Sequence, residues 1–93
     1  MGIKRTLVSL QPKQRDALVE VTADDLPFDL LERLRTVKLG SNGLIEFECN
    51  EYELDILIGS LTFEVNHQDE EDARKLVRLL KSILVGYREQ LKV

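Results

Sequence analysis

The segment 44–65, LIEFECNEYELDILIGSLTFEV, decides the fold of the chain because two secondary structures fit it. Ile45, Phe47 and Cys49 alternate with glutamates, which is typical of a strand with one buried face. The alternation continues through the rest of the segment, interrupted by the pair 59–60 (Gly-Ser), which suits a tight turn. One interpretation is therefore a three-stranded β-meander at 44–65 that packs against the C-terminal helix.

The second half of the same segment also fits an amphipathic helix over about 51–65. Apolar residues recur at helical spacing on one face: Leu54, Leu57, Ile58, Leu61 and Val65. Asn50 and Glu53 have the spacing of a capping box, which satisfies free backbone N–H groups at a helix start. Leu57 distinguishes the two structures, because it would be buried in the helix but would lie on the polar face of the meander. We favour the helix and keep the meander as the alternative.

An internal repeat supports this preference. TLVSLQPKQRDALVEV (6–21) and IEFECNEYELDILIGS (45–60) share an alternating strand, a polar break and a candidate helix that contains Asp-x-Leu. Pro12 suits the first position of the earlier helix, where its missing N–H is not needed. Two such units predict strands near 6–10 and 44–49 that pair as a small ribbon. The helices must cover this ribbon, because two strands alone are only marginally stable.

The clearest helical pattern is at the C-terminal end, over about 70–91. Its apolar residues recur on one face: Leu76, Leu80, Ile83, Leu84, Tyr87 and Leu91. We expect Asp69 to be the N-cap, with further acids in the first turn that complement the helix dipole. Immediately before this helix we expect the preceding one to end at Val65, with Asn66 leaving it and His67 exposed in the corner.

A fourth helix is predicted over about 27–38, with Pro27 at its first position. Its buried residues are expected to be Leu30, Leu31, Leu34 and Val37. The sequence GSNG at 40–43 then breaks the chain with residues that tolerate left-handed backbone. The predicted fold is a single domain, 1–93, of the α+β class, mainly helical, with about four helices and a two-stranded β ribbon.

Composition places the chain among small soluble domains. Of its 93 residues 43% are hydrophobic and 32% are charged, an apolar content too high for a disordered chain. Cys49 is the only cysteine, so no intrachain disulfide can form, as in proteins of a reducing compartment. The early apolar runs are too short for a signal peptide, and none approaches the ~20 residues of a membrane span. We expect a cytoplasmic protein with no membrane partner.

The stretch FEVNHQDEEDARKLVRLL (63–80) resembles a cluster of metal ligands or a proton-transfer site, because His67 is followed by four acids. Only one histidine and one cysteine exist, too few for a typical transition-metal site. An acid–base enzyme that uses His67 with Asp69 is a third, disfavoured hypothesis. We therefore expect helix ends rather than a site here.

Other catalytic patterns are also missing from the sequence. No nucleophile motif surrounds the four serines, which are Ser9, Ser41, Ser60 and Ser82. Cys49 has no basic neighbours to lower its pKa and is expected to be a small core residue. GSNG lacks the lysine and the spacing of a phosphate-binding loop. We expect no enzyme, no cofactor, no metal and no small-molecule substrate.

Charge is distributed unevenly along the chain. Residues 41–72 contain ten acids and no Lys or Arg, whereas residues 73–93 contain six basic groups and only Glu89 as an acid. The basic residues of the last helix fall largely on one face: Arg74, Arg78, Lys81, Arg88 and Lys92. This face is either balanced by the acidic segment or binds an acidic partner such as nucleic acid. We favour internal balance.

Self-association is the remaining functional hypothesis. In a helix over 51–65, Ile56 and Phe63 lie on the opposite side from Leu54, Leu57 and Leu61. A helix that is apolar on two sides is either central in the monomer or shared with a neighbour. We expect a non-catalytic protein-interaction or regulatory module whose partner is a second copy or another protein. The alternative is a nucleic-acid-associated accessory protein that uses the basic face of the C-terminal helix.

The C-terminal half also resembles a known type of domain. Its pattern is a strand, a capped Glu-Leu-Asp-x-Leu helix, Glu-x-Asn-His, a polar break and a Leu-rich last helix. The matching positions are Glu53, Leu54, Asp55, Leu57, Glu64, Asn66 and His67. The segment is similar in this to a small uncharacterised bacterial helical domain found in plasmid-borne open-reading-frame proteins. The resemblance implies helices and a bacterial source, and it implies no activity.

Overall fold

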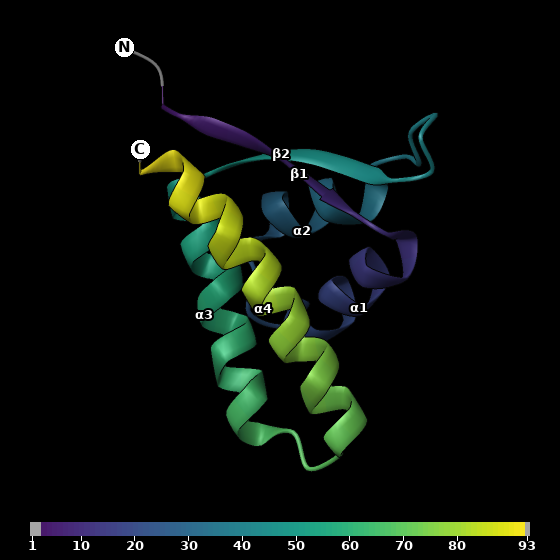
Figure 1. Cartoon of the computed structure of the whole chain (residues 1–93), viewed down its shortest axis with the longest axis vertical. Helices are drawn as coiled ribbons and strands as arrows, with labels where there is room; N and C mark the ends of the chain where they lie inside the picture. Colours follow the sequence, from purple (N-terminus) through teal and green to yellow (C-terminus); the bar gives the residue numbers. More distant parts are fainter. Residues whose placement is uncertain (1–2, 93) are drawn as a thin grey trace.

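The computed structural model of the chain describes residues 3–92, which form four α-helices and one two-stranded antiparallel sheet (Figure 1). The elements in chain order are β1 (Arg5–Leu10), α1 (Pro12–Thr22), α2 (Phe28–Thr36), β2 (Ile45–Asn50), α3 (Glu51–His67) and α4 (Glu71–Leu91). The predicted α+β, mainly helical fold is confirmed, and the alternative β-meander at 44–65 is wrong.

The ribbon closes one end of the molecule. β1 and β2 pair in antiparallel register, with Val8 opposite Phe47 and Leu10 opposite Ile45. The predicted pairing of strands near 6–10 and 44–49 is confirmed. These four side chains are buried against the helices. Figure 1 shows the ribbon lying across one end of the hairpin formed by α3 and α4, with α1 and α2 also below it. The helices thus supply the packing that two strands lack alone.

The start of α3 is set by the predicted capping box. The Glu53 N–H donates to Asn50 Oδ1 at 2.8 Å, and the Asn50 N–H donates to Glu53 Oε1 at 3.0 Å. These two bonds satisfy backbone donors that a helix start leaves free. Leu57 is fully buried, as the helix requires and the meander does not.

The end of α3 lies two residues beyond the predicted Val65. Asn66 is inside the helix, and its predicted role as the residue that leaves it is wrong. The helix ends where Gln68 becomes extended, and the Gln68 N–H donates to the Glu64 carbonyl at 2.9 Å. No non-glycine residue among 3–92 has a positive φ, so this corner needs no left-handed residue.

Pro12 is the first residue of α1, as predicted. The N–H of the preceding Gln11 donates to Gln14 Oε1 at 2.9 Å. Arg15, in the second turn, donates from Nη1 to the carbonyl oxygens of Leu34 and Val37, each at 3.1 Å. Because the last carbonyls of a helix have no partners within it, Arg15 both caps α2 and fixes α1 against it.

The predicted bounds of α2 need correction. Pro27 is not the first helical residue: its ψ of 144° is extended, and the helix runs from Phe28 to Thr36 rather than over 27–38. Val37 is extended as well, with ψ of 134°. Leu30 and Leu34 are buried as expected, whereas Leu31 and Val37 are only partly buried.

α4 is rotated relative to its predicted buried face. Val77 is buried with Leu80 and Leu84, whereas Leu76 remains 38% exposed. The remaining predicted residues are partly buried: Ile83, Tyr87 and Leu91. The reason is that α4 packs against both α3 and β1, so its buried arc is centred between these two contacts. The Ser9 N–H of β1 donates to the Tyr87 hydroxyl oxygen at 3.2 Å, which marks the second contact.

The predicted N-cap of α4 is also wrong. Glu70, and not Asp69, precedes the first helical residue, and its side chain makes no capping hydrogen bond. The link between α3 and α4 is instead held by Arg74, which donates to the Gln68 carbonyl at 2.5 Å and pairs with Glu71 at 3.6 Å. A guanidinium that reaches back from the second turn thus ties the link in place of the expected side-chain cap.

Candidate protein-interaction surface

α3 exposes a second apolar face to solvent. Tyr52, Ile56, Gly59 and Phe63 recur at spacings of four, three and four, which places them on one side of the helix. We call these four residues the outer stripe. Tyr52 is 72% exposed and Phe63 is 54% exposed, whereas the core leucines on the opposite side of α3 are fully buried.

Sequence reasoning found only half of the outer stripe. Ile56 and Phe63 were expected opposite the buried leucines, but Tyr52 and Gly59 were missed. The missing signal was present in the sequence, because the 4-3-4 spacing from Tyr52 to Phe63 is that of one helical face. In the sequence, Tyr52 also fits the alternating pattern of the meander, and Gly59 fits its turn.

Gly59 leaves a hollow in the middle of the outer stripe. The hollow has a volume of about 360 Å³ and is lined by Asp25, Asp55, Ile56, Gly59, Ser60 and Phe63. A Cβ atom on Gly59 would meet no atom within 4 Å, so no contact inside the chain requires glycine here. A glycine within a helix costs about 0.5–1 kcal/mol relative to alanine. The monomer alone therefore gives no reason for this residue.

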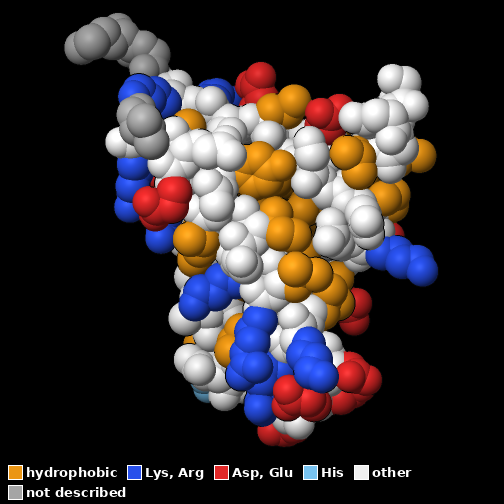
Figure 2. Space-filling model, viewed as in Figure 1, with side chains coloured by type: hydrophobic (Ala, Val, Ile, Leu, Met, Phe, Trp, Pro, Cys, Tyr) orange, Lys and Arg blue, Asp and Glu red, His pale blue; other side chains and the backbone are white. Residues whose placement is uncertain are grey.

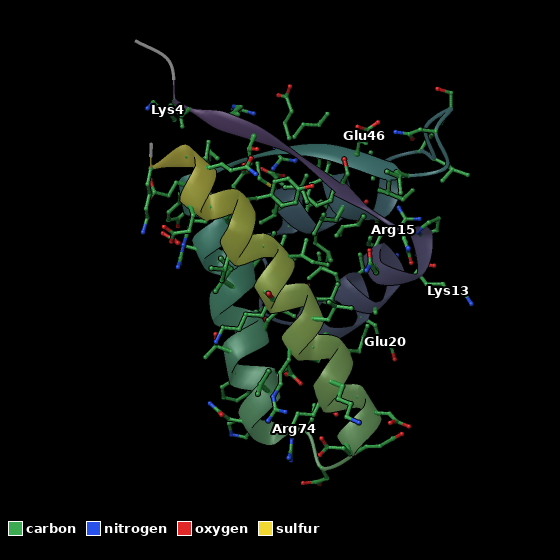
Figure 3. The ribbon with its side chains drawn as sticks, in the orientation of Figure 1. Lys4, Lys13, Arg15, Glu20, Glu46 and Arg74 are labelled. Carbon is green, nitrogen blue, oxygen red and sulfur yellow. The ribbon has the colours of Figure 1, made fainter. Side chains whose placement is uncertain are left out.

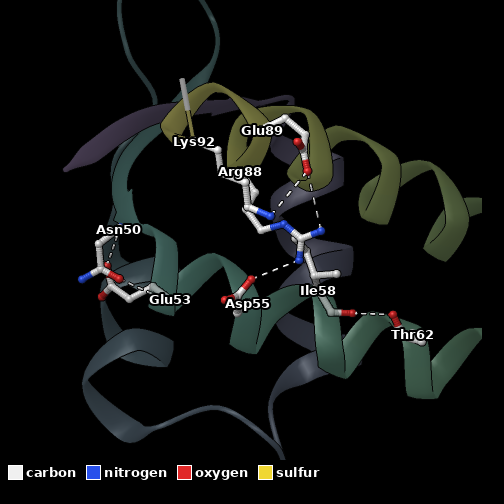
Figure 4. Close-up of polar contacts among 8 residues, drawn as sticks. All are labelled: Asn50, Glu53, Asp55, Ile58, Thr62, Arg88, Glu89 and Lys92. Carbon is white, nitrogen blue, oxygen red and sulfur yellow. Dashed lines mark hydrogen bonds and ion pairs between the residues drawn. The ribbon is translucent and has the colours of Figure 1, made fainter. Parts of the chain in front are cut away.

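Two carboxylates of α3 near the outer stripe are paired with other helices. Glu53 forms an ion pair with Arg33 of α2. Asp55 accepts a hydrogen bond from Arg88 Nη1 of α4 at 3.0 Å, and Figure 4 shows Arg88 reaching from α4 to α3. α3 lies in the most acidic part of the chain, but these pairs reduce the negative charge beside its outer stripe.

Only some residues of the predicted basic face of α4 have partners within the chain. Arg74 is held by Gln68 and Glu71, as described above, and Arg88 by Asp55. Lys92 Nζ lies 3.9 Å from Glu89 (Figure 4). Figure 3 shows Arg74 at the end of the α3–α4 hairpin. Within residues 3–92, Arg78 and Lys81 have no ion pair or hydrogen bond. The part of this face without partners is therefore the pair Arg78 and Lys81.

His67 interacts with its own helix. Its ring stacks on Phe63, with centroids 4.0 Å apart and an interplanar angle of 17°. Its Nδ1 lies 2.8 Å from the Phe63 carbonyl oxygen, which can only accept, so Nδ1 is the protonated nitrogen in this contact. The structure does not bring Asp69 into contact with the imidazole. In the described part of the chain, no three His, Cys, Asp or Glu side chains are grouped to hold a metal ion.

Cys49 is enclosed in the core below the ribbon, with no exposed surface. Burial, which disfavours the charged thiolate, raises the pKa of this thiol from 9.0 to about 12, and the Glu53 carboxylate adds to the effect. The thiol is therefore protonated at neutral pH and lacks the thiolate character of a nucleophile.

Comparison with known proteins gives no match: no protein-family model, no curated protein and no solved structure is significantly similar to the chain. No helix within residues 3–92 combines the length and the apolar content needed to span a bilayer.

Proposed function

We propose that the chain is a non-catalytic protein-interaction module that forms a homodimer through the outer stripe of α3. The observation that carries this proposal is the row formed by the exposed Tyr52 and Phe63 and the partly buried Ile56, with the unexplained Gly59 among them. Glycine at a helix surface allows another backbone or a large side chain to approach closely. Because Cys49 is the only cysteine, we propose a reducing cytoplasm as the setting.

The outer stripe is complementary to itself. Most homodimers have two-fold symmetry and use the same surface on both copies. A two-fold axis perpendicular to α3 at its centre places the α3 helices of the two copies antiparallel. If the axis passes between Leu57 and Ile58, Tyr52 faces Phe63 of the second copy, and Ile56 faces Gly59 of the second copy. Both pairs of positions are symmetric about the same point of α3, so one two-fold axis forms both contacts. Each contact occurs twice: two Tyr52–Phe63 pairs form, and the Ile56 side chain of each copy enters the hollow at Gly59 of the other.

The carboxylates at this interface have hydrogen-bond partners in their own chain. In the proposed dimer Asp55 of one copy approaches Ser60 and Asp25 of the other. Asp55 is already paired with Arg88, and Asp25 already accepts a hydrogen bond from the Ser60 hydroxyl at 2.9 Å. Each carboxylate therefore keeps a partner from its own chain when the two surfaces meet. A single helix pair provides a small interface, so we expect a Kd in the micromolar range.

Gly59→Ala tests the proposal because it should change stability and association in opposite directions. The added methyl group has open space in the monomer and improves helix propensity, so the free energy of unfolding should rise by about 0.5–1 kcal/mol. In the dimer the same methyl group occupies the hollow that receives Ile56, so association should weaken about tenfold. Sedimentation velocity across micromolar loading concentrations measures the association, and urea unfolding measures the stability.

Gly86→Ala is the matched control. Gly86 lies within α4, and a Cβ atom there also meets nothing within 4 Å, but it is outside the outer stripe. This variant should gain the same stability and keep the wild-type Kd. A strictly monomeric wild type, or equal Kd values for the two variants, would overturn the homodimer.

The alternative is an accessory protein that binds nucleic acid. It is supported by Arg78 and Lys81, which have no partner within the described residues. It is disfavoured because the other three basic residues are held by groups of the same chain. Phosphate binding by two free cations would weaken steeply with salt. Fluorescence anisotropy with a labelled duplex at low salt tests it, and Arg78→Glu with Lys81→Glu should abolish any binding.

A further inference from the structure

A second surface lies away from the outer stripe, in a groove between α1, α4 and the end of α3. It has a volume of about 430 Å³ and is lined by Ala17, Glu20, Val21, Asp24, Glu64, Gln68, Ala73, Leu76 and Val77. We call it the acid-rimmed groove. α1 contacts α4 less extensively than α3 does, and the groove lies between them.

The floor of the groove is apolar. Ala17 and Val21 come from α1, and Ala73, Leu76 and Val77 come from α4. Leu76 is 38% exposed although it belongs to the main apolar pattern of α4. Figure 2 shows hydrophobic side chains in a band along α4, with Lys and Arg side chains around its lower half. The floor thus offers apolar surface that no element of the chain covers.

The rim of the groove is acidic. It contains Glu20 of α1, Asp24 in the turn after α1 and Glu64 of α3. Figure 3 shows Glu20 on α1 beside α4. Within residues 3–92 none of the three carboxylates forms an ion pair; Glu64 accepts only a hydrogen bond from Gln68 Nε2 at 3.2 Å. Near the outer stripe, by contrast, Glu53 and Asp55 each form an ion pair.

We propose that the acid-rimmed groove binds a short amphipathic helix of a partner protein that carries Lys or Arg beside its apolar residues. The lining residues Ala17, Glu20 and Val21 lie on one face of α1, and Asp24 lies two residues beyond its end, so the groove runs along the C-terminal part of this helix. A third helix laid between α1 and α4 would cover the floor. Basic side chains reach a rim of carboxylates while their methylene stems cover apolar surface.

The probe is a fluorescent Leu–Lys peptide of about 14 residues, roughly four helical turns with one apolar face. A Leu–Glu peptide of the same pattern is the control for hydrophobic binding alone. Anisotropy titration of the full chain measures the Kd, and amide chemical-shift changes locate the contact. We expect the Leu–Lys peptide to bind, with the largest shifts at Ala17, Val21 and Ala73, and the Leu–Glu peptide to bind at least tenfold more weakly.

The deciding variant reverses two rim charges, Glu20→Lys with Asp24→Lys. Both side chains are exposed, so the fold should persist, and peptide affinity should fall about tenfold. The matched control makes the same charge change at the exposed Glu48 and Asp69, outside the groove, and should alter affinity less than about twofold. Equal losses in the two variants would show non-specific attraction and overturn the proposal.

Two further outcomes would also overturn it. Amide chemical-shift changes centred on Ile56 and Gly59 would place the peptide on the outer stripe. If the variant Glu20→Lys with Asp24→Lys loses the homodimer, the acid-rimmed groove binds a second copy of the chain and not a partner helix. The proposals for the groove and for the homodimer can be refuted independently, because Gly59→Ala should weaken the homodimer and leave the peptide Kd unchanged.

Discussion

The two sides of α3 have similar apolar content but different surroundings. On the inner side Leu54, Leu57 and Leu61 have no exposed surface, because α4, α1 and the ribbon cover them. On the outer side Tyr52 and Phe63 are more than half exposed. Hydrophobicity alone therefore does not distinguish a core face from a contact face on this helix.

The difference lies in how the side chains complement what faces them. The inner leucines are uniform in size and belong to a continuous core of buried residues. The outer side alternates aromatic, aliphatic and absent side chains around a hollow at Gly59. A surface with projecting side chains beside a hollow can be complementary to the same surface of a second copy.

The largest effect is expected from a core truncation, Leu57→Ala. It removes a fully buried side chain and leaves a cavity, so the free energy of unfolding should fall by about 2–5 kcal/mol. Ile56→Ala, one residue away, removes a side chain that is only partly buried, and should cost less than about 1.5 kcal/mol in the monomer. Urea unfolding at low protein concentration measures both.

The dependence of self-association on protein concentration also distinguishes the two variants. Ile56→Ala should weaken self-association, whereas Leu57→Ala should leave the dimer Kd unchanged wherever the chain is folded. Equal stability losses in the two variants would contradict the distinction between an inner and an outer side.

The sequence was sufficient for those elements that depend on local signals. The capping box of Asn50 and Glu53, the first-turn proline Pro12 and the alternation in the strands each act within a few residues. They predicted the helix over the meander, the start of α1 and the pairing of the ribbon. Leu57 identified the helix because it is buried in only one of the two structures.

The remaining features depend on contacts between distant segments. Arg15 caps α2 from α1, and Arg74 holds the link that Asp69 was expected to cap. Val77 is buried because α4 has two neighbours, which a helical pattern in one segment does not show. The acid-rimmed groove escaped prediction for the same reason: its walls come from three helices, and no short stretch contains its pattern.

The second prediction uses pH to probe the core side of the molecule. Below pH 9 the Cys49 thiol is protonated in both states; above it the unfolded chain loses the proton while the folded chain retains it until about pH 12. Stability should therefore fall as pH rises, by about 2 kcal/mol at about pH 10.5. Cys49→Ala should lack this part of the decline, and parallel curves for the two proteins would refute it.

The capping box at the start of α3 stabilises the helix that carries both the inner and the outer side. Asn50→Ala removes the acceptor of the Glu53 N–H, and it should lower the free energy of unfolding by about 1 kcal/mol. Asn50→Ser retains a capping oxygen and should keep most of the stability. Urea unfolding monitored by circular dichroism measures both, and an equal loss in the serine variant would show that the capping oxygen is unimportant.

The smallest effect on stability is expected at the ion pair between Arg88 and Asp55, which determines the charge beside the outer stripe. Because the Asp55 side chain is 52% exposed, solvent screens the pair, and a double-mutant cycle should give a coupling of about 0.5 kcal/mol or less.

Arg88→Gln should nevertheless weaken association, because it leaves an unpaired carboxylate at the hollow of each copy. The dimer should weaken about threefold at low salt and recover at high salt. Adding Asp55→Asn removes that carboxylate and should restore the wild-type Kd; if sedimentation gives the same weakened Kd for the single and the double variant, Arg88 affects the dimer through packing and not through charge.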